Sequence, residues 1–260
     1  MSIIETLTPK PGARILVTGG GAGIGRRIAE GFLEAGARVH VSDLDPAAVA
    51  GFTRGEGRTG EVSDARDPDA TAALAAAAAE ALGGLDVVIA NAGVAGPTAP
   101  VDAFGREAWD ETLEVNLRGV WALAAAAAPH LRASRGLFLA TSSVAGRLGY
   151  ANRTPYAASK WGVVGLVKSL AVELGPEGVR ANAILPGIVE GPRIERVIAA
   201  RARAEGRSVE ETRRLYLDKV SLRRMVTADE VAAACLYLAS PAGSAVTGQA
   251  LCVCAGVETL

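Results

Sequence analysis

The sequence predicts an α/β fold in which one doubly wound parallel sheet of about seven strands is covered by helices on both faces. The first observation behind this prediction is that short β-branched segments alternate with longer segments of helical pattern. Such alternation produces parallel strands that are joined through helices. The second is that most of the strand segments are apolar throughout, as strands buried on both faces require.

The predicted strands are short, and longer helices lie between them. The strand pattern occurs at 14–18, 38–42, 59–62, 85–90, 137–141, 179–185 and 250–253. The helical pattern occurs at 24–35, 69–82, 106–129 and 156–174. Gly175 and Pro176 end the last of these helices, and Ser240-Pro241 ends a further one. Capping boxes at 208–211 and 227–230 predict additional helix starts in the C-terminal third.

Length and composition indicate a single domain that covers residues 1–260. The chain contains no Pro- or Ser-rich linker and no internal repeat. Its formal net charge of -1 disfavours nucleic acid or a membrane surface as a partner. The apolar stretches are shorter than the ~20 residues that span a bilayer, and residues 1–12 do not resemble a signal peptide. Three cysteines are too few for a disulfide framework, so we expect a cytoplasmic protein with small, buried cysteine side chains.

The first predicted strand leads into a glycine-rich turn and then into a helix. Gly19, Gly23 and Gly25 lie in this turn, and Ile24 stands at the start of the helix. Glycines let the backbone turn tightly and approach a pyrophosphate, which binds against the free N–H groups of the helix N-terminus. The alternative is a tight turn without a ligand, but its place between the first strand and the first helix favours a dinucleotide site.

The second predicted strand is followed directly by Asp43, 18 residues after Gly25. A carboxylate at this point accepts hydrogen bonds from the adenosine ribose diol and repels a 2′-phosphate. Leu44 follows it, and the turn from Gly19 to Gly25 contains no basic residue. The sequence therefore favours NAD over NADP, the alternative being that Asp43 is an ordinary solvated acid.

Together with residues further along the chain, this turn resembles the short-chain dehydrogenase/reductase family, of the Tyr-x-x-x-Lys type. The resemblance extends from Ile15 to about Gly256. The matching elements are Thr18-Gly19-x-x-x-Gly23-x-Gly25, Asn91-Ala92-Gly93 after the fourth strand, Asn116, Ser143, Tyr156-x-x-x-Lys160 and Pro186-Gly187. The resemblance implies a Rossmann-like fold and a nicotinamide dinucleotide that contacts the turn, Asn91, Gly93, Gly187 and the backbone near Val189.

The sequence departs from the family pattern in three places. After the third strand, where the family has Asp and an aliphatic residue at the adenine, the chain has Glu61-Val62. Gly191 stands where the family often has a Thr that contacts the nicotinamide amide. Near the C-terminus, Cys254-Ala255 replaces an Asp-Gly pair. None of these positions carries the acid/base group, so the departures concern cofactor geometry and packing.

Tyr156 and Lys160 lie one helical turn apart and share a face of the predicted helix. A free tyrosine has a pKa of about 10, too high for an efficient base at neutral pH, and a neighbouring ammonium group favours the phenolate. We therefore assign Tyr156 as the general acid/base and Lys160 as its electrostatic partner. The resemblance adds that Lys160 holds the nicotinamide ribose. Taken alone, the pair is equally compatible with amphipathic packing.

Ser143 follows the fifth strand, at the carboxyl edge where doubly wound sheets bind their ligands. Its hydroxyl is expected to donate to the substrate oxygen, although a Ser-Ser pair after a strand is also a common turn. Asn116 resembles the family residue that supports a water-linked proton route to the lysine. His40 and His130 lie near no carboxylate or cysteine cluster at metal spacing, so we expect no metal site. The absence of a G-x-S-x-G element around Ser143 disfavours a serine hydrolase.

The resemblance implies that the segment of about 190–225 forms a small helical lid over the substrate. Between residues 190 and 224 there are ten basic and six acidic residues, a local charge of +4. Ile194, Val197 and Ile198 give this segment an apolar helical face. We hypothesise that Arg193 or Arg196 points inward and pairs with an anionic group of the substrate. The alternative is a solvated helix face on which arginines and glutamates pair with each other.

These observations predict an NAD-dependent oxidoreductase that transfers a hydride between NAD(H) and a secondary alcohol or ketone, with Ser143, Tyr156 and Arg193 at the substrate. The favoured substrate is a polar or anionic hydroxy compound, such as a hydroxy acid or a sugar. A 3-oxoacyl-thioester reductase is the alternative enzyme, although such reductases usually use NADP. A non-catalytic nucleotide sensor is disfavoured because it would need none of the four catalytic positions. The resemblance also implies a homo-oligomer, either a tetramer or a dimer.

Overall fold

The computed structural model describes residues 3–257 and contains a seven-stranded sheet in which all strands run parallel. The strands are β1 (Arg14–Thr18), β2 (Arg38–Asp43), β3 (Arg58–Val62), β4 (Val87–Ala90), β5 (Leu137–Thr141), β6 (Arg180–Pro186) and β7 (Ala250–Val253). Their order across the sheet is β3-β2-β1-β4-β5-β6-β7. The predicted doubly wound parallel sheet is therefore confirmed. The winding direction reverses between β1 and β4, which places a crevice at their carboxyl ends.

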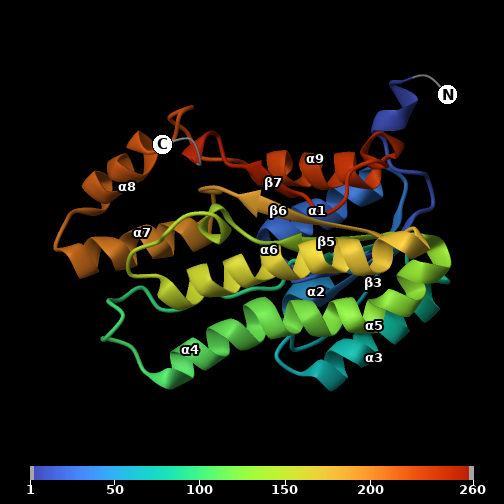
Figure 1. Cartoon of the computed structure of the whole chain (residues 1–260), viewed down its shortest axis with the longest axis horizontal. Coiled ribbons are helices and arrows are strands. Elements are labelled where there is room, and N and C mark those ends of the chain that lie inside the picture. Colours follow the sequence, from blue (N-terminus) through green and yellow to red (C-terminus); the bar gives the residue numbers. More distant parts are fainter. Residues whose placement is uncertain (1–2, 258–260) are drawn as a thin grey trace.

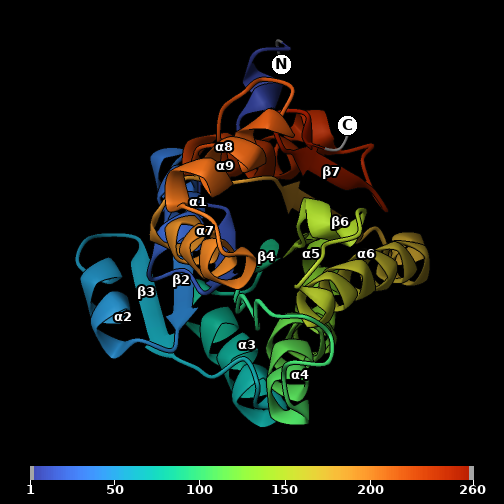
Figure 2. The same cartoon turned by 90° about the vertical axis from the view of Figure 1, so that its left-hand side faces the viewer.

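Helices cover both faces of the sheet (Figures 1 and 2). One face carries α1 (Gly23–Glu34) and α9 (Ala228–Ala239), which pack against each other. The other face carries α3 (Pro68–Leu82), α5 (Gly119–Ser134) and α6 (Thr154–Leu174), and α2 (Pro46–Phe52) lies beside β2 and β3. Beyond the carboxyl ends of the strands, α7 (Pro192–Glu205) and α8 (Val209–Asp218) pack together (Figure 1). No helix within residues 3–257 is long and apolar enough to cross a membrane.

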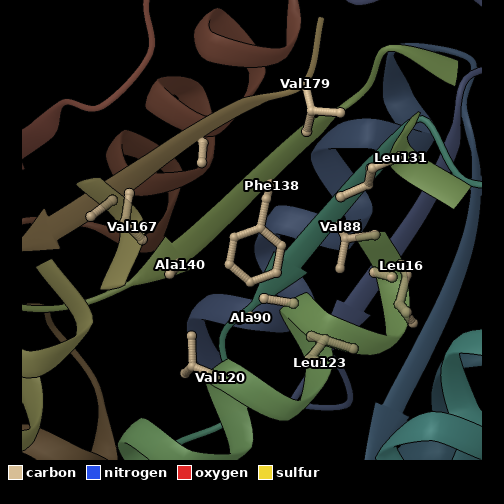
Figure 3. Packing of buried hydrophobic residues seen from close by; sticks show 14 of the residues in the cluster. Leu16, Val88, Ala90, Val120, Leu123, Leu131, Phe138, Ala140, Val167 and Val179 are labelled. Atoms are coloured by element: carbon tan, nitrogen blue, oxygen red, sulfur yellow. The ribbon is translucent and has the colours of Figure 1, made fainter. Parts of the chain in front are cut away.

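Side chains of the central strands alternate between two hydrophobic cores. Leu16 of β1 and Phe138 of β5 point toward α5 and its neighbours, as Figure 3 shows. Ile15, Val17 and Leu139 point to the opposite core, which contains α1 and α9. All five are completely buried, and burying a side chain of this size contributes about 1.5–3 kcal/mol. Because both faces of the sheet are covered by helices, successive residues inside these strands are apolar, and the sequence shows no alternation of polar and apolar residues.

The predicted helix at 106–129 is divided in the structure. α4 (Arg106–Leu113) ends in a π-helical turn, Glu114–Arg118, and α5 then continues through Pro129 to Ser134. The π turn contains Asn116, whose side chain forms hydrogen bonds with the backbone of Val94 in the loop that follows β4. Such single π turns are common at functional sites because they redirect one side chain without ending the helix.

The helix starts follow local capping chemistry. At α9 the Thr227 hydroxyl accepts from the N–H of Glu230 at 3.2 Å, and the Glu230 carboxylate accepts from the N–H of Thr227 at 2.9 Å, which completes the predicted capping box. At α8 the Ser208 hydroxyl accepts from the N–H of Glu211 at 3.1 Å, which is one half of the predicted box. The unpredicted helix α2 begins where the Asp45 carboxylate accepts from the N–H of Ala47 at 2.8 Å.

Candidate active site

A cavity of about 1290 Å³ opens at the carboxyl ends of the strands, between the β1–α1 turn and the α7–α8 pair. It spans the reversal point between β1 and β4, where ligands of doubly wound sheets bind. The cavity is lined by most of the residues that the sequence assigned to the cofactor: Gly19, Gly23, Ile24, Gly25, Asp43, Asn91, Gly93, Tyr156, Lys160, Gly187 and Val189. Residues far apart in the chain thus meet at one edge of the sheet.

The glycine-rich turn approaches the end of β4 so closely that it excludes side chains. A Cβ atom on Gly25 would overlap the carbonyl oxygen of Gly19 and the amide nitrogen of Asn91. That amide nitrogen donates to the backbone oxygens of Thr18 at 3.2 Å and Gly19 at 3.1 Å, and the Asn91 carbonyl oxygen accepts from the Thr141 hydroxyl at 3.2 Å. Asn91 thereby fixes the turn to β5. The first N–H groups of α1, which has no side-chain cap, border a space that a pyrophosphate fits.

Asp43 is held at the adenosine end of the cavity. Its carboxylate accepts from the N–H of Gly21 at 3.0 Å and from the N–H of Asp45 at 3.2 Å. These bonds fix the carboxylate against the glycine-rich turn, at the position expected for an adenosine ribose. The carboxylate therefore lines the cavity beside the turn.

The adenine-side assignment from the sequence is corrected by the structure. Glu61 and Val62 belong to β3, Val62 is 52% exposed, and neither residue lines the cavity. The lining at this edge begins after the strand and consists of 63–66. Side chains past the carboxyl end of a parallel strand face the ligand crevice, whereas those within the strand face the helices or solvent. Asp64 and Ala65 are among these lining residues, whereas the predicted contacts Glu61 and Val62 are not.

Tyr156 lies in the first turn of α6, and Ser143, two residues after β5, lines the same cavity and favours the ionised form of the Tyr156 phenol. Lys160 follows one turn later, with its Nζ atom 5.7 Å from the centre of the Tyr156 ring. Burial opposes ionisation of the phenol, but the charges of Lys160 and Arg193, the Ser143 hydroxyl and the charge of Arg153 together lower the pKa of Tyr156. The phenol is therefore a stronger acid than a free tyrosine, as a proton donor and acceptor near neutral pH must be.

Lys160 is buried beneath the cavity floor. Its ammonium group donates to the backbone oxygen of Thr141 at 2.8 Å. Burial lowers the pKa of Lys160 to about 8, although the nearby Tyr156 acts in the opposite direction. An ammonium group with this pKa exchanges protons readily at physiological pH, so it can act both as a charge and as a member of a proton relay.

Asn116 is completely buried and stands behind the cavity wall. Its carbonyl oxygen accepts from the N–H of Val94 at 2.8 Å, and its amide nitrogen donates to the oxygen of Val94 at 3.1 Å and to the Ser159 hydroxyl at 3.2 Å. A Cβ atom on Gly93 would lie 3.1 Å from the Asn116 oxygen and 3.7 Å from Lys160 Nζ. Gly93 therefore separates Asn116 from Lys160. The water-linked proton route through Asn116 stays a prediction.

The arginines of the 190–225 segment differ in whether their side chains form an ion pair with a glutamate. Arg193 reaches inward and donates to the backbone oxygen of Gly93 at 3.1 Å, and Arg196 also lines the cavity. Arg201 lines the cavity as well, but it pairs with Glu205 at 2.8 Å within α7. The pairing of Arg193 or Arg196 with a substrate anion stays a prediction.

Sequence analysis missed two residues beside the catalytic group. Arg153, the residue before α6, is 4% exposed and lies over the rings of Tyr150 and Tyr156, with its guanidinium carbon 5.3 Å and 4.5 Å from their centres. The Tyr150 hydroxyl is 2.9 Å from the hydroxyl of Tyr216 on α8. The sequence offers no signal for this cluster, because Tyr150 and Arg153 precede α6 and Tyr216 is distant in the chain.

The described residues contain no group of three or more His, Cys, Asp or Glu side chains that could hold a metal ion. His40 is buried in β2, and burial lowers its pKa to about 4. Its Nδ1 atom is 3.0 Å from the Thr59 hydroxyl. Cys235, Cys252 and Cys254 form no disulfide within the described residues.

The parallel sheet, the glycine-rich turn at its carboxyl edge and the Tyr-Lys pair on the adjacent helix are features of dinucleotide-dependent oxidoreductases. The family model described as "Enoyl-(Acyl carrier protein) reductase" matches residues 19–258. The chain belongs to the short-chain dehydrogenase/reductase family, whose members bind a nicotinamide cofactor.

Similar proteins include two curated dehydrogenases and a solved reductase. The chain is 36% identical over 250 residues to "Probable galactose dehydrogenase GalD" of Rhizobium meliloti (strain 1021), with 94% of each chain covered. It is 36% identical over 246 residues to cis-4-hydroxycyclohexanecarboxylate dehydrogenase of Sinomonas cyclohexanicum, covering 93% of this chain and 94% of the relative. The crystal structure of 3-ketoacyl-(acyl-carrier-protein) reductase from Brucella melitensis complexed with NADH is 27% identical, with a TM-score of 0.86 and coverage of 95% and 99%.

Proposed function

We propose that the protein is an NAD-dependent dehydrogenase that interconverts a secondary alcohol and a ketone, with Tyr156 as the acid/base. The single observation that carries this proposal is the position of Tyr156, which lies close to Lys160 and lines the same cavity as Ser143 and the glycine-rich turn. A dinucleotide that binds with its pyrophosphate at the turn can extend its other end toward this group.

The proposed mechanism assigns one task to each of three side chains. A bound nicotinamide supplies the hydride acceptor or donor. The Ser143 hydroxyl donates to the substrate oxygen and orients it toward the phenol. When an alcohol is oxidised, the Tyr156 phenolate takes the hydroxyl proton, and in the reverse direction the phenol returns it. The Lys160 ammonium group stabilises the phenolate and is placed to hold the nicotinamide ribose.

Replacement of Tyr156 by Phe tests the acid/base assignment. Y156F keeps the ring and its packing but removes the proton that the reaction exchanges. We expect turnover of alcohols, followed by nicotinamide absorbance, to fall by a factor of at least about a hundred, while NADH binding measured by fluorescence is retained. An active Y156F variant would remove the proposal.

Selection of NAD over NADP is assigned to the fixed carboxylate of Asp43. The N–H groups of Gly21 and Asp45 hold this carboxylate in place, and its charge would repel a 2′-phosphate. The NADH complex of the similar Brucella reductase supports the same choice. Fluorescence titrations with NADH and NADPH should show tighter binding of NADH, and Asp43→Ser should reduce that difference. Equal affinities in the wild-type protein would contradict the assignment.

The proposed substrate is a polar or anionic hydroxy compound, such as a sugar or a hydroxy acid. The names of the two curated relatives cover one compound of each kind. Arg193 is the second residue of α7, and its side chain points into this cavity. Its hydrogen bond to the Gly93 oxygen uses only one guanidinium nitrogen. The remaining donors are suited to a carboxylate.

Substrates matched in shape test the role of Arg193. We expect Arg193→Ala to lower kcat/KM for cis-4-hydroxycyclohexanecarboxylate by at least about tenfold relative to cyclohexanol. Arg203→Ala is the matched control, because Arg203 lies on the same helix, is exposed and does not line the cavity. Equal losses for the acidic and the neutral alcohol would exclude a direct pairing.

A 3-oxoacyl-thioester reductase is the second candidate, favoured by the similarity to the Brucella reductase. The two candidates differ in the size of the substrate, because a thioester carries a long pantetheine arm. Reduction of an acetoacetyl thioester at a rate well above that of any simple ketone would favour the second candidate. Failure to reduce thioesters, with turnover of polar alcohols, would favour the first.

We further propose that 1–260 form one catalytic domain with 190–225 as a substrate lid, and that the protein is a cytoplasmic homo-oligomer. Trp121 and Trp161 support an oligomer, because they lie on α5 and α6 and are 53% and 51% exposed. Exposed tryptophans on neighbouring helices are typical of interfaces. Gel filtration with light scattering should give a dimer or a tetramer, and Trp161→Glu should shift the protein toward the monomer.

A further inference from the structure

Arg153 is the one strongly buried arginine beside the proposed acid/base. It stands immediately before α6, three residues ahead of Tyr156, and only 4% of its surface is exposed. Its Nη2 atom donates to the backbone oxygen of Ala95 at 2.8 Å, which fixes the guanidinium group to the loop after β4. Its position at the cavity wall places a fixed positive charge next to the reacting phenol.

The guanidinium group lies between two aromatic rings. Its carbon atom is 4.5 Å from the centre of the Tyr156 ring and 5.3 Å from the centre of the Tyr150 ring. Distances below about 6 Å are those of cation–π contacts, which are strongest when the pair is shielded from water. The contact restrains the ring of Tyr156 on one side.

The charge of Arg153 has no permanent counter-charge. Within residues 3–257 it forms no ion pair, and its buried Nε atom has no hydrogen-bond partner. Buried charges in proteins are normally paired, because an isolated charge loses its hydration. No carboxylate pairs with it among the described residues, so a negative charge that forms next to it is stabilised.

Of the two rings, only that of Tyr156 can supply this negative charge. Burial raises the pKa of Tyr150, and its hydroxyl is engaged with that of Tyr216. Lys160, Arg193, Ser143 and Arg153 all favour the ionised form of Tyr156. We propose that Arg153 is a positioning residue, whose guanidinium group holds the ring of Tyr156 and stabilises its phenolate; this inference rests on the proposed role of Tyr156.

The arrangement also explains why an arginine is suited to this place. A guanidinium group is flat, so it fits between two rings and still directs one N–H to a carbonyl oxygen. A lysine ammonium group carries the same charge but cannot make both contacts from one plane. A neutral side chain of similar length would keep the packing and lose the charge.

Direct titration of the phenol tests this role without a substrate. The chain contains four tyrosines, so the difference in tyrosinate absorbance between the wild-type protein and Y156F isolates Tyr156. The same difference is measured in R153M, R153Q and R153K backgrounds, with folding checked by circular dichroism. R153M and R153Q both remove the charge, whereas R153K keeps it, so comparison with R153K separates the charge from the shape of the guanidinium group.

We expect the pKa of Tyr156 to rise by about one unit in R153M and R153Q, and by less in R153K. Arg58→Met is the matched control, because Arg58 lies 5.4 Å from the Phe52 ring and outside the cavity. The control should leave the titration unchanged. If R153M does not fold, R153Q decides alone.

A folded R153M or R153Q protein whose Tyr156 titrates as in the wild type would overturn the inference. That result would leave the proposed function intact as long as Y156F is inactive. An active Y156F variant would instead remove the proposed function, and with it the reason for assigning Arg153 this role. The two failures are therefore distinguishable.

Discussion

Replacing Lys160 by Met should weaken the acid/base by an amount that follows from the structure. The Lys160 Nζ atom is 5.7 Å from the centre of the Tyr156 ring. At an effective dielectric constant of about 20, two unit charges at this separation interact by about 3 kcal/mol. Because one pKa unit corresponds to about 1.4 kcal/mol, K160M should raise the pKa of Tyr156 by about two units.

The pH dependence of alcohol oxidation measures this shift. Oxidation requires the phenolate, so kcat/KM falls as the pH drops below the pKa of Tyr156. In K160M this acidic limb should move about two units to higher pH, and on the limb the rate should be about a hundredfold lower. The oxygen of Thr141 also loses its donor, which costs about 1–3 kcal/mol of stability. The assay therefore needs a temperature at which the variant stays folded.

Lys168→Met is the matched control for this experiment. Lys168 lies on the same helix, is exposed, and donates to the backbone oxygen of Gly248 at 3.1 Å, away from the cavity. Its pH profile should match that of the wild type. A K160M profile with its acidic limb at the wild-type pH would refute the electrostatic role of the lysine, even if the overall rate were lower.

Two further changes test the fold around the site. The pKa of His40 is about 4 in the folded protein, whereas an unfolded histidine has a pKa of about 6.5. As the pH falls from about 6.5 to about 4, only the unfolded state therefore gains this proton. The free energy of unfolding in urea should therefore drop by about 3 kcal/mol more in the wild type than in His40→Phe between pH 7 and pH 4, and parallel curves would contradict the assignment. Gly25→Ala should weaken NADH binding by at least about tenfold because its Cβ would meet Gly19 and Asn91. Gly165→Ala, at a helical position with open space, is its control and should bind NADH normally.

The strands could be predicted because burial on both faces leaves a strong local signal. β1, β5 and β7 have the predicted bounds, and the other strands begin or end within two residues of theirs. The division of 106–129 could not be predicted in this way. A π turn adds one residue without changing the apolar content of the helix, and its cause, the bonds between Asn116 and Val94, is a tertiary contact.

The adenine-side error shows where a motif fails as a guide. The sequence places the adenine contact at Glu61-Val62, the end of the third predicted strand, but β3 is an edge strand with half-exposed side chains, so its end has a weak signal. At the end of β2, buried side chains up to Ser42 make the boundary clear and place Asp43 at the cavity. Motif positions are thus most reliable next to strands buried on both faces.

The same reasoning explains why Arg153 was overlooked while Tyr156 and Lys160 were not. Tyr156 and Lys160 are linked by helical spacing, which the sequence displays directly. The environment of Arg153 depends on its bond to Ala95, which is 58 residues away in the sequence. It also depends on the contact between Tyr150 and Tyr216, which are 66 residues apart. A charged residue in a loop is ordinarily solvated, so only the fold reveals that this one is enclosed. Because Tyr216 belongs to α8, the residues that enclose the acid/base include part of the proposed lid, and the position of α8 should therefore influence the chemistry of Tyr156 as well as access to it.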